Sequence, residues 1–337
     1  MSDNIIRFGI LGSGVISGSH AEAIQRMDTA ELVGVTSVDL PGAEAFARKF
    51  AIRCYPDYET MLADESIDAI CICTPSGFHK DNAIQALRAG KHVVLEKPMA
   101  FTRAEAKEID AAAKKNGRVL TTICQLRFFP DIQKAKKIVD EQILGKLVFC
   151  DLSMKYWRDP AYFAGSNWRG TKALDGGGAL MNQGIHGVDL LLYIVGDGKV
   201  VYAKNRTRFH DIEVEDASVA VLEFENGAMG AIEASTCSNP GFERRIEING
   251  TRGTMVLVEG RMDKLIVDGK PLIDGGKTSD AGTSGSNAMP AWEPYTWQLG
   301  NFINAIHGKE ELLLTATEGS RAVGMIEDIY SFGCQKG

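Results

Sequence analysis

The first third of the chain alternates short apolar runs with amphipathic stretches. Strand-like runs occupy residues 5–11, 31–37, 67–73, 92–95 and 119–124, and helical patterns lie between them at 15–27, 42–51, 78–89 and 102–116. Near-continuous apolar strands separated by helices are typical of a parallel sheet covered on both faces. Because crossovers between parallel strands are right-handed, this pattern predicts a doubly wound α/β fold.

The pattern changes after about residue 125. A helix is predicted at 130–142, a strand at 147–157, a helix at 178–195, and two alternating strands within 217–235. Asn226 and Gly227 join the last two strands, and Asn-Gly between alternating hydrophobic residues is the strongest short hairpin signal. With further strands at 243–249 and 254–258, this part predicts an α+β domain on an open, mostly antiparallel sheet.

The chain of 337 residues predicts two domains, at about 150 residues per domain. We place the parallel-sheet domain at 1–124 and the α+β domain at 125–337. Residues 268–288, rich in Gly, Ser, Thr and Asp, are expected to form a loop. Helical patterns return at 292–307 and 315–332, and these C-terminal helices can pack back towards the first domain.

The formal net charge of −7 excludes some partners. An acidic surface attracts neither nucleic acid nor an anionic membrane, so neither partner is expected. No apolar run approaches the roughly 20 residues that cross a bilayer, and the N-terminus shows no secretory pattern. Cys71 and Cys73, the one close pair among seven scattered cysteines, are expected in the core. A cytoplasmic protein is therefore expected.

A glycine-rich turn follows the first predicted strand. Gly12 and Gly14 stand in the pattern G-x-G-x-x-S, which Ser17 completes, and Val15 and Ile16 begin the following helix. Such a turn lets backbone N–H groups approach a pyrophosphate, and the helix N-terminus adds partial positive charge. The alternative is an ordinary glycine-rich turn, but its place after an apolar strand favours a Rossmann domain that binds NAD or NADP.

The end of the second strand bears on the choice of cofactor. An acidic residue about 20 positions after the glycines would bind the ribose hydroxyls. Ser37 occupies that position, and Asp39 follows two residues later. Ser37 does not repel a 2′-phosphate, but no Arg follows to bind one and Asp39 would oppose it. The sequence leans slightly to NAD over NADP.

Three motifs together resemble the Gfo/Idh/MocA oxidoreductases: GSGVISGSH near the start, HVVLEKP at 92–98, and GGGALMNQGIHGVDLL at 176–192. The resemblance covers nearly the whole chain in order. It implies an N-terminal Rossmann domain and a C-terminal α/β domain that binds substrate and mediates oligomerisation. It also implies NAD(P)-dependent oxidation or reduction of a sugar, cyclitol or sugar derivative, usually in homodimers or homotetramers.

The resemblance also implies roles for particular residues. Lys97 and His186 match the catalytic residues of the family. Residues matched to, or expected near, the cofactor are Thr74, Pro75, His79, Glu96, Lys97, Gln125, Trp168 and Arg169, and those expected at the substrate are Lys97, Arg127, Asn182 and His186. Asn182 is a departure, because inositol dehydrogenases carry Asp there; it resembles the sugar-nucleotide dehydrogenase branch.

The chemistry of these residue types suits alcohol oxidation. His186 is a suitable proton acceptor, since its ordinary pKa of about 6.5 lies near working pH. Lys97 can polarise the carbonyl oxygen, and Asn182, four residues before His186, is expected on the same helix face. Asp175 is expected to cap that helix, and Asp189 either fixes the imidazole tautomer or has a structural role.

Two other functions remain open at this point. A branch of the same family uses bound NAD transiently to hydrolyse glycosides, and a ligand-binding protein could keep the fold without catalysis. The pair formed by Lys97 and His186 speaks against the second alternative, since binding alone needs no proton-transfer groups. Neither a Cys/His cluster nor an H-x-x-x-H pair occurs, so no metal is expected.

Overall fold

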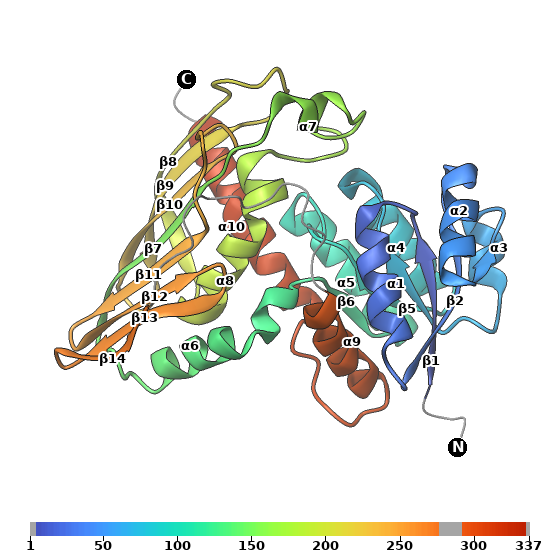
Figure 1. Cartoon of the computed structure of the whole chain (residues 1–337), viewed down its shortest axis with the longest axis horizontal. Helices are drawn as coiled ribbons and strands as arrows, with labels where there is room; N and C mark the ends of the chain where they lie inside the picture. The colour runs from blue at the N-terminus through green and yellow to red at the C-terminus, as the bar shows by residue number, and fades with distance from the viewer. Residues whose placement is uncertain (1–4, 276–291, 335–337) are drawn as a thin grey trace. The chain divides into compact units, whose positions relative to one another are not determined.

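The structure, a computed structural model, describes residues 5–275 and 292–334. It divides into two compact units, which are described separately (Figure 1). The first runs to Gln125 and takes in helix α9 (Trp292–Ile306); the second begins at Leu126 and takes in the last helix from Arg321 onwards. A helix from the predicted second domain, α9, therefore belongs to the first unit.

The first unit is built on a six-stranded parallel sheet. Its strands are β1 (Ile6–Leu11), β2 (Ala30–Thr36), β3 (Arg53–Cys54), β4 (Ala69–Ile72), β5 (His92–Leu95) and β6 (Leu120–Thr122), in the spatial order β3-β2-β1-β4-β5-β6. The order reverses between β1 and β4, and ligands of such sheets bind beyond the carboxyl ends of the strands at that point. The predicted doubly wound fold is confirmed.

Helices cover both faces of this sheet. They are α1 (Val15–Gln25), α2 (Leu40–Phe50), α3 (Tyr58–Ala63), η1 (Ser76–Phe78), α4 (His79–Arg88), α5 (Arg103–Asn116) and α9. Alternate strand residues pack on opposite faces, so Cys71 joins the core with α1, α2 and α9, whereas Ile70 and Ile72 join the core with α3, α4 and α5. Cys71 and Cys73 are buried free thiols.

The second unit contains an eight-stranded sheet. Its strands are β7 (Leu147–Lys155), β8 (Gly198–Arg206), β9 (Ala217–Phe224), β10 (Met229–Ser235), β11 (Arg245–Gly250), β12 (Gly253–Val258), β13 (Arg261–Val267) and β14 (Lys270–Asp274), in the order β14-β13-β12-β11-β7-β10-β9-β8. The pair β7–β10 is parallel and the other pairs are antiparallel, which confirms the mostly antiparallel prediction.

Two predictions for this sheet have different outcomes. The β9–β10 hairpin turns at the predicted Asn226-Gly227, where the side chain of Asn226 accepts a hydrogen bond from Ala228 N at 3.0 Å. The loop predicted at 268–288 begins instead with a turn and strand β14, because β13 offers an edge with which 270–274 can pair. Residues 276–288 of that predicted loop lie outside the described residues.

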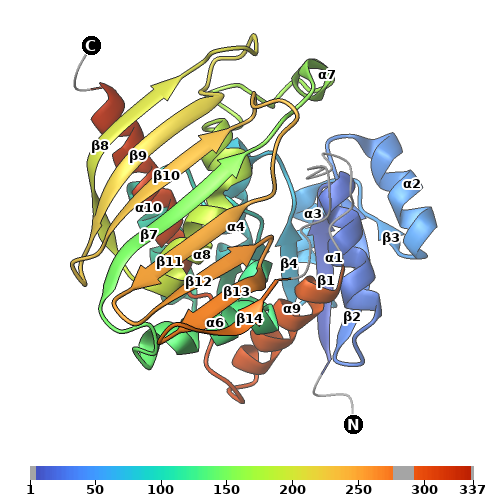
Figure 2. The same ribbon diagram turned by 60° about the vertical axis from the view of Figure 1, so that its left-hand side comes forward.

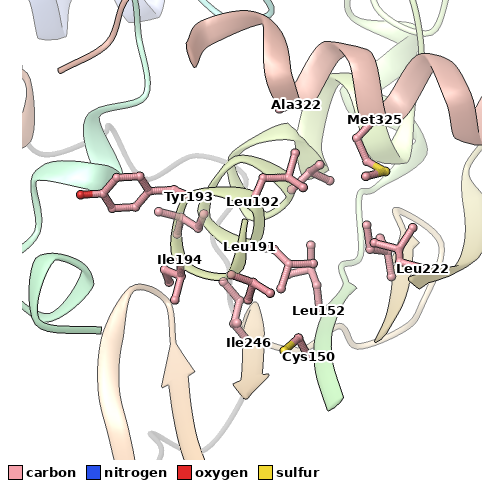
Figure 3. Packing of buried hydrophobic residues seen from close by; sticks show 14 of the residues in the cluster. Cys150, Leu152, Leu191, Leu192, Tyr193, Ile194, Leu222, Ile246, Ala322 and Met325 are labelled. Carbon is pink, nitrogen blue, oxygen red and sulfur yellow. The ribbon is translucent and has the colours of Figure 1, made fainter. Parts of the chain in front are cut away.

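Helices lie on one face of the second sheet (Figure 2). The helical elements of this unit are η2 (Gln125–Phe128), α6 (Pro130–Asp140), α7 (Pro160–Ala164), η3 (Ala179–Gly184), α8 (Ile185–Val195) and α10 (Ala316–Cys334). Figure 3 shows Leu191 and Leu192 of α8 between Leu152 of β7 and Ala322 of α10, all at most 2% exposed. Burial of each such leucine stabilises by about 1.5–3 kcal/mol, so α8 is a rigid base for the residues at its N-terminus.

Candidate active site

The glycine-rich turn lies between β1 and α1. Gly12 has φ +109°, and a Cβ there would lie 2.6 Å from the carbonyl oxygen of Cys73. Gly14 is the N-cap residue, and a Cβ there would meet none of the described atoms within 4 Å. Among the described residues no side chain caps α1, so the N–H groups of its first turn, which begins at Val15 and Ile16, can bind an anion.

These two glycines predict different consequences of adding one methyl group. Gly12→Ala should lower the free energy of unfolding by about 2–4 kcal/mol, because the residue is strained and clashes with backbone. Gly14→Ala should leave stability within about 0.5 kcal/mol but raise the Kd for NADH at least about tenfold, by filling the space for the pyrophosphate. Urea denaturation measures the free energy of unfolding, and NADH fluorescence titration measures the Kd. Unchanged NADH affinity in Gly14→Ala would place the pyrophosphate elsewhere.

The end of β2 carries the residues expected at the adenosine ribose. Ser37 is half-buried, and its hydroxyl accepts a hydrogen bond from Asp39 N at 3.3 Å. Asp39 is exposed and caps α2, since its carboxylate accepts from Gly42 N at 3.2 Å. The carboxylate is thereby held at this strand end.

His79 joins the turn after β4 to the turn after β5. It is buried, its Nδ1 lies 2.7 Å from the carbonyl oxygen of Pro98, and its Nε2 lies 3.0 Å from that of Thr74. Burial lowers the pKa of His79, and a neutral imidazole carries one N–H, so one contact at a time is a hydrogen bond. His79 therefore lies between the Thr74-Pro75 turn and the turn at Pro98 and can donate a hydrogen bond to either backbone.

Glu96 and Lys97 follow β5, and sequence reasoning missed the partner of Glu96. Its Oε1 lies 2.8 Å from Nε2 of His20 on α1, and its Oε2 accepts from the backbone N–H of Lys97 at 3.1 Å. His20 and Glu96 are both buried, and the ring of Tyr295 on α9 meets His20 edge-on. No sequence signal links two residues 76 positions apart.

The pair formed by His20 and Glu96 is ionic. Burial alone would raise the pKa of Glu96, but His20 and Lys97 lower it overall. Burial alone would lower the pKa of His20, but the facing carboxylate of Glu96 raises it above its ordinary value. Burial raises the pKa of the Cys73 thiol, which stays protonated, so the carboxylate of Glu96 is the anion that faces His20. Glu96 thus holds the backbone of Lys97 from a fixed position, and the side chain of Lys97 is half-buried.

Gln125 ends the first unit with an unsatisfied buried acceptor. Its Nε2 makes a long contact of 3.5 Å to the hydroxyl of Tyr295, and its Oε1 has no hydrogen-bond partner in the described part of the chain. An amide N–H of a ligand would satisfy this oxygen, as the carboxamide of a nicotinamide ring can. Together with the uncapped turn at Gly12 and Gly14, this acceptor fits a nicotinamide dinucleotide.

In the second unit, η3 and α8 carry the predicted substrate residues. The predicted cap by Asp175 is wrong, because Glu215 accepts hydrogen bonds from Gly178 N at 3.0 Å and Leu180 N at 2.9 Å. Tyr330 of α10 donates to the same carboxylate at 2.8 Å. A Cβ on Gly178 would lie 1.9 Å from the carbonyl oxygen of Glu215, so only glycine allows this approach.

Asp175 has another role, which concerns Asn182. Its fully buried carboxylate accepts from the Asn182 amide at 2.5 Å and from Gly170 N at 2.8 Å. Asn182 lies in η3, which is a π-helix, so its four-residue spacing to His186 crosses from wider to ordinary helical geometry. That both side chains project from one helix face stays a prediction. His186 itself is half-buried in the first turn of α8.

Arg127 and Asp189 form a buried pair. Arg127 Nε lies 3.0 Å and Nη2 lies 2.7 Å from the two carboxylate oxygens of Asp189, and Arg127 is 0% exposed. Because two nitrogens of its guanidinium bind the two carboxylate oxygens, Arg127 connects η2 to α8. This pairing supports the structural alternative for Asp189, and the predicted substrate contact of Arg127 stays a prediction.

Trp168 and Arg169 lie in the loop after α7 and are both half-buried. The guanidinium of Arg169 lies 4.4 Å from the ring centre of Tyr162, whose hydroxyl accepts from Gln183 of η3 at 2.8 Å. This connects the loop to the stretch that carries Asn182. Their predicted contact with the cofactor stays a prediction.

The predicted site residues fall into two groups. Lys97 and most of the cofactor residues belong to the first unit, whereas Asn182, His186, Trp168 and Arg169 belong to the second. Convergence of Lys97 and His186 on one substrate stays a prediction. Within residues 5–275 and 292–334, no group of His, Cys, Asp and Glu side chains is arranged to hold a metal ion.

A parallel sheet with a switch point and an uncapped glycine turn defines a dinucleotide-binding enzyme class. The family model described as "Oxidoreductase family, NAD-binding Rossmann fold" matches residues 6–123, and that described as "GFO/IDH/MocA C-terminal domain" matches residues 132–256. The chain belongs to the GFO/IDH/MocA oxidoreductase family.

Individual proteins are similar to this chain over most of its length. D-glucoside 3-dehydrogenase of Escherichia coli is 30% identical over 71% of this chain and 72% of its own length. Myo-inositol 2-dehydrogenase of Thermotoga maritima is 26% identical over 94% and 93%. The crystal structure of the WlbA dehydrogenase from Bordetella pertussis, in complex with NADH and UDP-GlcNAcA, has a TM-score of 0.87 and 31% identity over 99% of this chain and 98% of that chain.

The family and fold predictions are confirmed. The chain is an NAD(P)-dependent oxidoreductase of the sugar and cyclitol dehydrogenase class, as the sequence predicted. In the described ranges, no helix combines the length and apolar character that crossing a membrane needs.

Proposed function

We propose that His186 exchanges the proton of the substrate hydroxyl while Lys97 polarises the same oxygen. The proposal is supported by the fixed backbone position of each residue within its own unit. Lys97 follows a strand end, and its backbone is held by Glu96, whereas His186 begins a helix that is buried along its length. A proton-transfer group acts best when its own position is fixed.

The two residues have complementary chemistry. In oxidation, His186 accepts the hydroxyl proton at a ring nitrogen, and in reduction it returns that proton. Lys97 donates a hydrogen bond from Nζ to the oxygen, which stabilises negative charge as it develops. Asn182, whose amide nitrogen bonds Asp175, can orient a substrate hydroxyl but cannot accept a proton.

The chain's own residues account for cofactor binding. Gly12 and Gly14 would hold the pyrophosphate at the N-terminus of α1, Ser37 would face the ribose, and Gln125 would bind the carboxamide. NAD(P), when bound, accepts or supplies the hydride. Within the chain, Glu96 keeps its charge beside Lys97 because His20 is its buried counter-ion.

We propose NAD rather than NADP as the preferred cofactor, because Asp39 opposes a 2′-phosphate. Asp39→Asn should narrow the preference for NADH over NADPH by about three- to tenfold, since it removes one exposed charge. Stability should stay unchanged because Asn caps a helix as well as Asp does. Fluorescence titration with both cofactors measures the ratio. An unaltered ratio would assign the discrimination to other residues.

We propose a pyranose, a cyclitol or a sugar nucleotide as substrate. The relatives support this range, since their names and titles include a glucoside, an inositol and UDP-GlcNAcA. Asn182, in place of the Asp of inositol dehydrogenases, favours a sugar derivative over inositol. A screen of cyclitols, pyranoses and UDP-sugars with both cofactors, followed by NADH absorbance, tests the proposal. Glycoside cleavage without net NADH would instead favour the hydrolase alternative.

We further propose that the protein is a cytoplasmic homodimer or homotetramer. The face of the second sheet opposite its helices carries the exposed side chains of Phe149, Val219, Val221 and Met229. Exposed apolar side chains gathered on one face support an interface between copies.

A further inference from the structure

Asn182 belongs to a chain of side-chain hydrogen bonds that runs from a guanidinium to a carboxylate. At one end Arg158 donates to the amide oxygen of Gln183, from Nη2 at 2.7 Å and from Nε at 3.2 Å. Gln183 Nε2 donates to the amide oxygen of Asn182 at 2.9 Å, and Asn182 Nδ2 donates to Asp175 at 2.5 Å. All four residues belong to the second unit, so the chain is complete within one compact body.

The two ends of the chain fix its direction. A guanidinium can only donate, so the group of Gln183 that faces Arg158 must be the oxygen. The nitrogen of Gln183 then faces Asn182, which must turn its own oxygen towards it. At the other end Asp175 also accepts from Gly170 N at 2.8 Å, so its carboxylate is an acceptor for two N–H donors. Both ends therefore require the same orientation of the Asn182 amide.

Burial makes this orientation unfavourable to reverse. Asp175 is 0% exposed, and Arg158 and Asn182 are each 9% exposed. Hydrogen bonds to charged groups are strong in such surroundings. A reversed amide would set donor against donor beside Gln183 and acceptor against acceptor beside Asp175. Asn182 keeps some exposed surface whereas Asp175 has none, so Asp175 can act on a substrate only through Asn182.

The chain also accounts for the amide at position 182. An aspartate there could accept from Gln183 but, when ionised, could not donate to Asp175. Its carboxylate would instead face a second buried carboxylate at hydrogen-bonding distance. Position 182 must therefore both accept and donate, and an asparagine does so with one side chain.

We infer that Arg158, Gln183 and Asp175 are positioning residues for the substrate. Together they fix the side-chain amide of Asn182, with its nitrogen on the side of Asp175 and its oxygen on the side of Gln183. The inference rests on the proposed function, in which Asn182 orients a substrate hydroxyl, and it specifies which atom of Asn182 lies in which direction. A hydroxyl that meets the wrong atom loses its hydrogen bond, and the reaction loses specificity.

Moving the carboxylate from one side of Asn182 to the other tests the inference. In Asp175→Asn, Gly170 N still needs an acceptor, so the new amide turns its N–H towards the nitrogen of Asn182. In Gln183→Glu, the new carboxylate turns an oxygen towards the oxygen of Asn182. Each single variant should lower the thermal midpoint by about 2–6 °C, because each leaves one contact in the chain without a hydrogen bond.

The double variant Asp175→Asn/Gln183→Glu is the matched control, since it reverses the chain without breaking it. The new carboxylate at 183 accepts from Arg158 and from Asn182, and the hydroxyl of Tyr162, now 2.8 Å from Gln183 Nε2, can rotate to donate to it. The new amide at 175 donates to Asn182. The thermal midpoint should therefore return to within about 2 °C of that of the unchanged protein.

Substrate recognition should not return with stability, because the amide of Asn182 is reversed in the double variant. Its kcat/KM should stay at least about tenfold below that of the unchanged protein. A purely structural role of the chain would restore the thermal midpoint and kcat/KM together. Differential scanning fluorimetry measures the midpoints. NADH absorbance measures turnover of myo-inositol, methyl α-D-glucopyranoside and UDP-N-acetylglucosamine by the NAD-loaded enzyme.

Two outcomes would overturn the inference. One is a double variant whose loss in thermal midpoint is the sum of the two single losses, which would show that the chain has no fixed direction. The other is a double variant with the kcat/KM of the unchanged protein. Failure of the proposed function reads out separately, as no turnover of any probe by the unchanged protein, and the midpoints then still decide whether the chain fixes the amide.

Discussion

Replacement of Lys97 by methionine should lower kcat by about 10²–10⁴-fold. Methionine keeps the length of the side chain but removes the Nζ donor that stabilises charge on the reacting oxygen. NADH affinity should stay close to that of the unchanged protein, because the substitution keeps the backbone N–H at position 97 that Glu96 accepts. Steady-state kinetics on the substrate found by screening, with NADH fluorescence titration, measures both quantities.

Lys107→Met is a suitable control, because it removes a lysine from the exposed side of α5. Its kcat should match that of the unchanged protein. Turnover by Lys97→Met within about twofold of the unchanged protein would remove Lys97 from the mechanism.

Replacement of His20 by leucine should lower the free energy of unfolding at pH 7 by about 3–5 kcal/mol, because it leaves the buried carboxylate of Glu96 without its counter-ion. The pKa of His20 is raised above 6.5 by Glu96, so its contribution is complete below pH 6.5 and is lost as the pH rises through the raised pKa. The pKa of Glu96 is lowered, so its contribution is present above pH 4.5 and is lost as the pH falls through the lowered pKa. The deficit of His20→Leu in the free energy of unfolding should therefore shrink as the pH rises above 7, as urea denaturation would measure.

The double variant His20→Leu/Glu96→Met is the matched control for this pair. It removes both charges together, so it should be more stable than His20→Leu alone. If the losses in free energy of unfolding from the two substitutions instead add, the contact between His20 and Glu96 does not stabilise the protein as an ion pair.

Much of the fold could be read from local patterns. The strands of the first sheet are buried on both faces and separated by helices, and this is a strong signal of a parallel sheet. Short elements such as β3 (Arg53–Cys54) and α7 (Pro160–Ala164) escaped prediction, because two to five residues contain too little periodicity. Strand β14 was hidden by its polar, glycine-flanked sequence and forms because β13 offers an edge.

The candidate site was predictable where a motif carries it and not where distant residues meet. Gly12, Gly14 and Lys97 lie at a strand end, where local sequence shows the chemistry. Glu215 lies 37 positions from Gly178 and 35 from Leu180, so no local pattern could identify it as the cap of η3. The same limit applies to Arg127 and Asp189, 62 positions apart, whose pairing no local pattern indicates.

The first unit's need for α9 affects how the protein must be made. Tyr295, Leu299 and Phe302 of α9 are at most 1% exposed and pack into the core that contains β1 and α1. Synthesis from the N-terminus produces the parallel sheet long before these residues emerge. One apolar face of the nascent parallel sheet therefore stays uncovered until nearly 300 residues have left the ribosome. We expect this order of events to favour chaperone binding early in translation.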